Sequence, residues 1–252
     1  MLQEPPRSPY DLVFPIADIP VRIHWTFWLV AVFMGMNGGG PVSLLMWVLA
    51  VFVSILAHEL GHALTAKAMA PQARQWIVLY SFGGLAMSTA KLRRPQRILQ
   101  VAAGPLAGLL LGVISFLAYQ AVKDAQAIYS PLGAFLNAMM FINFIWSFFN
   151  LVPVLPLDGG HIARELLCYL NERKAEARAQ FISMISAAIV AVIAFMMRQP
   201  FAGVFMIFMI MSSFQAWQLA RGRGGAPRRS GGQQPDEDRE SWQRKPDWWK
   251  KE

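Results

Sequence analysis

Residues 51–70 read VFVSILAHELGHALTAKAMA, an apolar segment that contains two histidines and a glutamate. His58 and His62 are four residues apart, so both imidazoles would leave one face of a helix, one turn apart. Two neutral imidazoles in this arrangement can bind one Zn²⁺, and Glu59, next to the first of them, can accept a proton from water. The segment therefore predicts a catalytic zinc site inside an apolar helix.

The opposing interpretation is a helix whose polar side chains pair with neighbours or face water. In a lipid-spanning segment each ionisable group costs about 2.5–3.5 kcal/mol on insertion scales, and such groups usually serve a function. Three of them so close together need a common partner, and a metal ion supplies one. The apolar context thus favours the metal site.

The composition indicates a membrane protein. Of the 252 residues, 55% are hydrophobic and 15% are charged, whereas soluble domains average about 45–50% apolar residues. The single cysteine, Cys168, excludes an intrachain disulfide. We expect an all-α polytopic protein embedded in the lipid bilayer, and no nucleic-acid partner in spite of the net charge of +8.

Six apolar segments predict transmembrane helices, since each approaches the roughly 20 residues that cross a bilayer. They cover residues 21–36, 42–66, 98–122, 131–151, 179–197 and 201–219. Between the second and the third, Gln75–Met87 is rich in β-branched and aromatic residues and is interrupted by Gly83 and Gly84, which predicts a small hairpin of two short strands or a re-entrant hairpin. Residues 161–178 are polar and predict an amphipathic helix on the membrane surface.

Composition also divides the chain into three parts. Residues 1–20 are rich in proline and predict an irregular cytosolic lead-in; they do not resemble a signal peptide, so the first span is expected to be an uncleaved insertion signal. Residues 21–220 predict a six-span membrane domain with its core at about 42–160. Residues 221–252 predict a disordered basic cytosolic tail, whose arginines serve either as a topology signal or as contacts to anionic lipid.

The basic residues predict the orientation in the membrane. With six spans and a cytoplasmic amino terminus, all of the 23 Lys and Arg residues except Lys123 and Arg198 fall on the cytoplasmic side, as the positive-inside rule requires. We therefore expect a bacterial inner (plasma) membrane protein with both termini in the cytoplasm. The second span then places His62 within roughly two turns, about 8–12 Å, of the cytoplasmic face. The fourth span delivers Asp158 to that same face.

A catalytic zinc needs three protein ligands and one open position. Asp158 is our choice for the third ligand, because it is a carboxylate followed by two glycines that allow close backbone approach. The alternative is that Asp158 caps the helix that begins near His161. His161 is itself a rival ligand, although we expect it to face the interfacial water.

The two motifs in this order resemble the site-2 protease family of intramembrane zinc metalloproteases. The resemblance rests on HELGH in one span and NLVPVLPLDGG after a later one, and FGG at 82–84 and AGPLAG at 103–108 are similar to further family motifs. It implies that His58, His62 and Asp158 hold one zinc ion per chain, with Glu59 as the catalytic acid and base. It also implies a core made of the second to fourth spans, and cleavage of a single-span substrate near the cytoplasmic side.

Other polar residues could assist catalysis. Asn150 is a candidate oxyanion donor or substrate ligand, or else the end of a helix before Pro153. His24 could donate toward the site or lie at the membrane interface, and Asn143 is expected to make an interhelical hydrogen bond. The strands around Gly83 and Gly84 offer an edge with which an extended substrate could pair.

Two further hypotheses compete with the intramembrane protease. One is a metal-binding membrane protein without hydrolysis, such as a transporter or an inactive homologue; Glu59 argues against it, since a transporter needs ligands but no base beside them. The other is a membrane-anchored zincin with a cytosolic site, which requires a later glutamate ligand such as Glu165 or Glu172.

Overall fold

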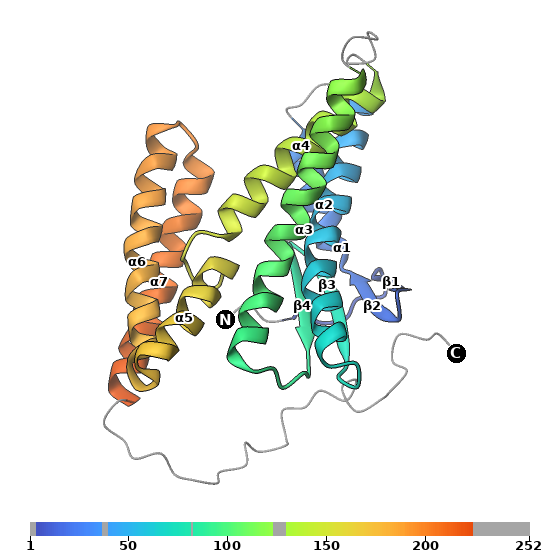
Figure 1. Cartoon of the computed structure of the whole chain (residues 1–252). Helices are drawn as coiled ribbons and strands as arrows, with labels where there is room; N and C mark the ends of the chain where they lie inside the picture. Colours follow the sequence, from blue (N-terminus) through green and yellow to red (C-terminus); the bar gives the residue numbers. More distant parts are fainter. Residues whose placement is uncertain (1–3, 37–39, 82, 123–129, 224–252) are drawn as a thin grey trace.

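The computed structural model describes residues 4–36, 40–81, 83–122 and 130–223. Figure 1 shows an arrangement dominated by helices, with one small sheet beside them. The elements in chain order are β1 (Leu12–Ile16), β2 (Ile19–Ile23), α1 (Trp25–Gly35), α2 (Pro41–Met69), β3 (Gln75–Tyr80), β4 (Gly83–Ser88), α3 (Arg94–Val122), α4 (Pro131–Asn150), α5 (Asp158–Leu170), α6 (Glu172–Met196) and α7 (Pro200–Arg223).

Five of these helices are long and apolar enough to cross a membrane. They cover Pro41–Met69, Arg94–Val122, Pro131–Asn150, Lys174–Met196 and Ala202–Arg221. At 1.5 Å per residue even the shortest, with 20 residues, is about 30 Å long, the thickness of the hydrocarbon core. The predicted second to sixth spans correspond to these five helices, which confirms the polytopic helical fold.

The prediction of a first transmembrane helix over residues 21–36 is wrong. The segment from Ile19 to Ile23 is a strand, and α1 has 11 residues, about 16 Å of helix. The helix begins late because His24 is in an extended conformation and its side chain accepts a hydrogen bond from the Thr26 N–H as an N-cap. By itself α1 is too short to cross the hydrocarbon core.

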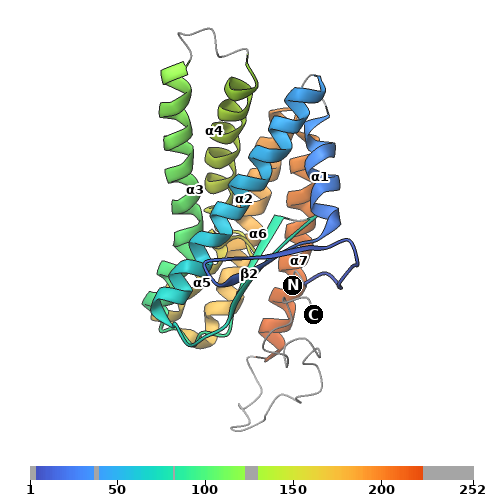
Figure 2. The same cartoon turned by 90° about the vertical axis from the view of Figure 1, so that its right-hand side faces the viewer.

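The helices α2, α3 and α4 pack side by side and form the core bundle (Figures 1 and 2). Small residues allow this approach: a Cβ atom on Gly61 would lie 2.9 Å from Ala107 Cβ of α3, and one on Gly108 would collide with Ser147 Oγ of α4. The predicted interhelical hydrogen bond is present, since Asn143 Nδ2 donates to Ser54 Oγ of α2 at 2.8 Å. Close backbone packing and inward polar groups thus hold α2 to α4 together.

One four-stranded sheet, in the order β1-β2-β3-β4, lies against α1 and α2. The strands β3 and β4 form the antiparallel hairpin that the sequence predicted, and β2 pairs with β3 in parallel after the α1–α2 crossover. The β1–β2 hairpin stands where an irregular lead-in was expected. It turns at Ala17 and Asp18, whose φ values of 47° and 59° suit a tight hairpin turn. Pro15 and Pro20 argued against strands, but they pair opposite each other in this hairpin.

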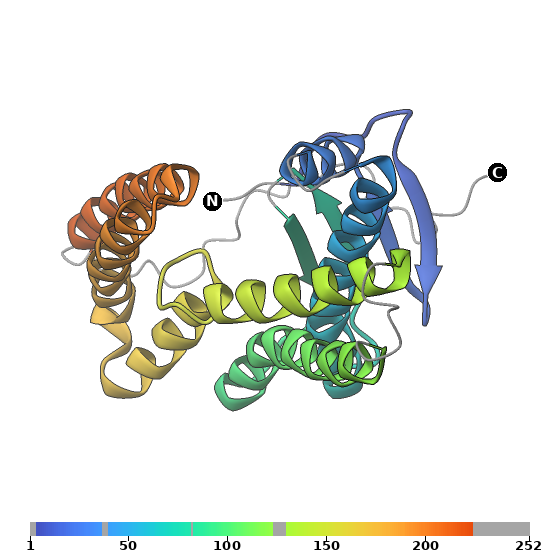
Figure 3. The same cartoon turned by 90° about the horizontal axis from the view of Figure 1, so that it is seen from above.

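The remaining helices form a separate layer. Figure 3 shows α6 and α7 as a hairpin beside the core bundle, with α5 between the two. The predicted surface helix over residues 161–178 is interrupted, because the Asn171 side chain caps α6 by accepting a hydrogen bond from the Lys174 N–H. The helix α5 is therefore short, and the rest of the predicted segment forms the first turns of α6. The predicted tail falls almost entirely on residues 224–252, outside the described residues.

Candidate metal centre

The structure brings His58, His62 and Asp158 together; we call these three residues the ligand triad. His58 Nε2 lies 3.1 Å from Asp158 Oδ2 and 3.2 Å from His62 Nε2, and His62 Nε2 lies 3.4 Å from the same carboxylate oxygen. Both histidines are buried, and Asp158 is partly buried. In the described part of the chain this is the one cluster of His, Cys, Asp or Glu side chains whose ligand atoms converge, within 4.8 Å of one another.

Two segments 100 residues apart build this cluster. The histidines lie one turn apart in the second half of α2, as the spacing predicted. Asp158 is the first residue of α5, and the N-cap position belongs to Leu157, so the Asp158 side chain is directed to the histidines and does not cap the helix. Gly159 and Gly160 pack against the backbone of Leu151–Leu155 with no space for a Cβ atom. This contact fixes the start of α5 against the segment that follows α4.

The distances within the ligand triad fit a zinc ion. Ligand atoms about 2.1 Å from a tetrahedral centre are about 3.4 Å from one another, close to the separations observed here. His62 Nδ1 donates to the Gln100 carbonyl oxygen at 2.9 Å, which leaves the Nε2 lone pair free for a cation. A Cβ atom on Gly104 would collide with the His62 ring. The first turns of α3 therefore determine both the tautomer and the position of His62.

Asp158 has the charge that a cation ligand needs. Burial raises the pKa of the Asp158 carboxyl, but the neighbouring His58 and His62 imidazoles outweigh burial and lower it to about 2. His58 Nδ1 is buried and has no hydrogen-bond partner among the described residues. The carboxylate is therefore ionised at neutral pH and faces two imidazole nitrogens.

Glu59 is buried directly under the β3–β4 hairpin. A Cβ atom on Gly84 would overlap the Glu59 side chain, and the backbone of Ala86 donates a hydrogen bond to its carboxylate. Tyr80, at the end of β3, is close enough that burial and the charge of Glu59 raise the pKa of Tyr80 to about 12. The carboxylate therefore lies between the ligand triad and the sheet.

The other predicted site residues make their contacts outside the ligand triad. Asn150 is the last residue of α4 and is buried; no hydrogen bond joins its side chain to the ligand triad within the described ranges. His24 caps α1, and its ring contacts Thr26 and lies 3.9 Å from Asp11. Gly83 contacts Trp146, whereas Phe82 lies outside the described residues. Their roles in the site remain predictions.

The predicted rivals of Asp158 lie elsewhere. His161 is exposed, as expected for a residue that faces water. Glu165 and Glu172, the ligands that a cytosolic zincin would require, form ion pairs with Arg97 and Arg94 at 3.0 Å each. Neither glutamate belongs to the converging cluster.

Comparison with known proteins shows the family. Residues 46–126 and 118–194 match the sequence profile of Peptidase family M50. The chain belongs to peptidase family M50. The matched segments overlap, extend from α2 into α6, and include the ligand triad and Glu59. The resemblance to site-2 proteases that the sequence suggested is confirmed, and this M50 chain is an integral membrane protein.

Relatives of this M50 chain include a zinc metalloprotease of Methanocaldococcus jannaschii, 31% identical over 171 residues, which are 66% of this chain and 49% of that protein. A Synechocystis protein provisionally named a zinc metalloprotease is 36% identical over 140 residues, 55% of this chain and 36% of that protein. This chain thus spans half or less of the length of these two relatives. The solved structure of a site-2 protease from M. jannaschii shares the fold, with a TM-score of 0.55 at 24% identity over 89% of this chain and 100% of that chain.

Sequence reasoning missed two contributors to the M50 site. Gln100 acts through its backbone carbonyl, which has no side-chain signature, so no sequence pattern could identify it. Gly104 lies in the AGPLAG motif, but its neighbour in space, His62, could not be inferred from the motif. Both lie on α3, which contributes no member of the ligand triad.

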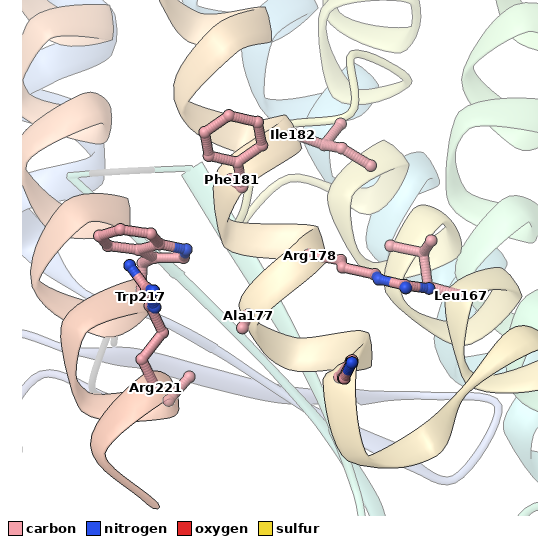
Figure 4. A pocket seen from close by; sticks show the side chains of 9 residues that line it. Leu167, Ala177, Arg178, Phe181, Ile182, Trp217 and Arg221 are labelled. Atoms are coloured by element: carbon pink, nitrogen blue, oxygen red, sulfur yellow. The ribbon is translucent and has the colours of Figure 1, made fainter. Parts of the chain in front are cut away.

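A groove of about 580 Å³ lies apart from the ligand triad, over α6 and between α5 and α7 (Figure 4). Its walls include the apolar Phe181 and Trp217, and the basic Arg178 and Arg221. Arg221 lies over the Trp217 ring, 4.6 Å from its centroid. No member of the ligand triad lines this groove, so the groove is separate from the candidate metal centre.

Proposed function

We propose that this chain is an intramembrane zinc metalloprotease. It hydrolyses a peptide bond within or near the transmembrane helix of a single-span, membrane-tethered substrate, close to the cytoplasmic face. The observation that carries this proposal is the convergence of three ligand atoms within 4.8 Å, next to the buried carboxylate of Glu59. Membership of family M50 and relatives named as zinc metalloproteases support both the metal and the reaction.

His58, His62 and Asp158 would hold one Zn²⁺ per chain through two Nε2 atoms and a carboxylate oxygen. When bound, the ion supplies Lewis acidity: it lowers the pKa of a coordinated water to about 7 and polarises a carbonyl group. The protein contributes orientation: Gln100 fixes the tautomer of His62, and Gly104 leaves space for its ring.

Glu59 is the proton carrier of the proposed reaction. Its carboxylate accepts a proton from the attacking water and delivers that proton to the amide nitrogen of the leaving group. The contact with Gly84 and the hydrogen bond from Ala86 restrict rotation of the carboxylate, so it is oriented before the substrate arrives.

The sheet supports a binding mode for the substrate. A peptide bond inside a helix is already hydrogen-bonded, so the substrate must unwind locally before it is cleaved. The strand β4 is last in the sheet order, and no strand pairs with its outer edge in the described part of the chain. We propose that the unwound segment pairs with this edge near Gly83 and Gly84, which brings its backbone to Glu59. Asn150 is the proposed donor to the developing oxyanion.

The distribution of basic residues supports an orientation. The end of α2, the start of α3 and the start of α6 lie at one end of the molecule (Figure 1), and they carry Lys67, Arg94, Arg97 and Arg178. We infer that this end is cytoplasmic, in a bacterial inner membrane, with both termini on the same side. His62 is seven residues from the end of α2, about 10 Å from the cytoplasmic face. Residues 21–220 would then form the protease domain, with its core at 42–160.

The test uses the full chain with Glu59→Gln, which removes the base but keeps the size of the side chain. We expect one zinc ion per chain to remain and cleavage of a single-span reporter in proteoliposomes to fall by about 10²–10⁴-fold. Glu172→Gln is the control, because Glu172 is an exposed carboxylate in an ion pair with Arg94. Membrane proteomics of cells with the Glu59→Gln chain should show accumulated single-span precursors. Cleavage at the wild-type rate by Glu59→Gln would falsify the proposal.

A further inference from the structure

Glu165 is a buried carboxylate for which the proposed reaction has no use. Its side chain is 5% exposed, and Oε1 lies 3.0 Å from Arg97 Nη1 of α3 and 3.6 Å from Arg164 Nη1 of α5. Burial of a carboxylate costs free energy unless a cation compensates its charge. Loss of the arginine partner would therefore destabilise the position of Glu165 and of the helix that carries it.

The position of Glu165 on α5 relates it to the metal centre. Asp158 and Glu165 are seven residues apart, close to two full turns, so both leave the same face of α5. Asp158 contacts His58 of α2, and Glu165 contacts Arg97 of α3. Arg97 is three residues before Gln100, whose carbonyl accepts the hydrogen bond from His62. One end of α3 therefore contacts both a histidine ligand and the helix that carries the carboxylate ligand.

The neighbouring ion pairs differ from this one in exposure. Arg94 pairs with Glu172 at 3.0 Å, but the Glu172 side chain is 68% exposed. Arg164 pairs with Glu176 of α6 at 2.5 Å, and both side chains are more than a third exposed. Exposed pairs are screened by water and contribute little. In the Arg97–Glu165 pair the Arg97 side chain is 46% exposed, but the carboxylate is 5% exposed and depends on its cation for compensation. Arg94 also joins the two helices, through the Cys168 carbonyl at 3.2 Å, but Glu165 with Arg97 is the α3–α5 contact that involves a buried carboxylate.

We propose that Arg97 and Glu165 act as positioning residues: their ion pair fixes the rotation of α5 and thereby holds Asp158 toward the histidines. The proposal deepens the proposed function, on whose metal site it rests. A side-chain atom about 5 Å from a helix axis moves about 1 Å for each 10° of rotation, whereas metal–ligand distances tolerate about 0.2 Å. The glycine contacts fix the start of α5, and the ion pair, two turns later, fixes its rotation.

The test measures zinc binding by the full chain in detergent, with a chromogenic chelator as competitor. We expect Glu165→Gln and Arg97→Gln each to weaken zinc binding by roughly 10-fold. The visible spectrum of the cobalt-substituted protein should change as well, because the ligand geometry changes. Glu172→Gln is the matched control, and its zinc affinity and cobalt spectrum should equal those of the wild type.

Arg97→Lys separates positioning from folding. Lysine keeps the charge but not the guanidinium geometry, so we expect zinc binding about threefold weaker than in the wild type. Wild-type zinc affinity and cobalt spectra in the two glutamine variants would overturn the proposal, even if their melting temperatures fall. If the glutamine variants do not fold, an unchanged Arg97→Lys protein overturns it. A wild-type chain that binds no zinc contradicts the proposed function instead, so the two failures are distinguishable.

Discussion

Two buried polar clusters in this protein differ in whether a cationic side chain compensates their carboxylates. The first, which we call the Arg22 cluster, contains Arg22, Glu4 and Asp11. Arg22 Nη2 donates to Glu4 Oε1 and to the Pro5 carbonyl at 2.8 Å each, and Nη1 donates to Asp11 Oδ2 at 3.2 Å. Its guanidinium group therefore meets acceptors on two sides and compensates both carboxylates, while Arg22 Nε and Asp11 Oδ1 have no hydrogen-bond partner among the described residues.

The ligand triad has the opposite character. Its two Nε2 atoms and its carboxylate oxygen face one another at 3.1–3.4 Å, and His62 already uses its Nδ1–H for Gln100. His62 Nε2 and the Asp158 oxygen are both acceptors, and acceptors that converge in a buried space require a cation or protons between them. Burial of charge is common to both clusters, but Arg22 supplies the cation in one, whereas the ligand triad contains no Lys or Arg side chain and is suited to a metal ion.

The largest expected effect comes from removing the carboxylate of the ligand triad. Asp158→Asn keeps the shape of the side chain but removes the charge, so zinc binding should weaken by more than about 100-fold, over about 2.7 kcal/mol, and reporter cleavage should be lost. Equilibrium zinc titration and the cleavage assay measure the two effects. The unfolding midpoint of the metal-free protein should not fall. A variant that retains zinc at wild-type affinity would show that the carboxylate is no ligand.

The Arg22 cluster should respond in the opposite way. Arg22→Met leaves two carboxylates without a cation, and we expect a loss of about 2–3 kcal/mol in the free energy of unfolding; fully buried pairs cost about 3–5 kcal/mol, and Glu4 can turn toward water. Denaturant unfolding in mild detergent measures the loss. Zinc affinity of the folded fraction should remain that of the wild type.

A triple variant, Glu4→Gln with Asp11→Asn and Arg22→Met, removes every charge of the Arg22 cluster. It should recover most of the lost stability, because no uncompensated charge remains. If instead Arg22→Met alters zinc affinity, the two clusters are coupled and the comparison between them fails.

The contrast also explains how much of the molecule the sequence could predict. The second to sixth predicted spans, the β3–β4 hairpin and the convergence of His58, His62 and Asp158 follow from apolar run length, spacing and topology, whereas the first predicted span was wrong. Those features depend on which residue types occur at which spacing along the chain, and both can be read directly from the sequence.

The features that escaped prediction depend on contacts between distant segments. Arg22 was counted as a cytosolic charge, yet it is 1% exposed and paired with residues of the lead-in. Glu165 was considered as a zinc ligand, and the structure shows it paired with Arg97. The carbonyl of Gln100 carries no signature at all. A charged residue in an apolar sequence indicates that a partner of opposite charge lies nearby. Which residue is that partner depends on how distant segments pack, and the sequence does not contain that information.

The smallest expected effect concerns how tightly the packing holds one ligand. A Cβ atom on Gly104 would lie 2.8 Å from His62 Cδ2 and closer still to Cε1 and Nε2, so Gly104→Ala should displace the ring and weaken zinc binding by about 10-fold, near 1.4 kcal/mol. Gly112→Ala is the matched control on the same helix, since its nearest contacts are 3.3 Å away on Asn143 and Phe144. Zinc titration of both variants decides the point. Equal affinities would mean that His62 can shift without leaving the metal, and that the Gln100 hydrogen bond, more than the space left by Gly104, determines where the imidazole lies.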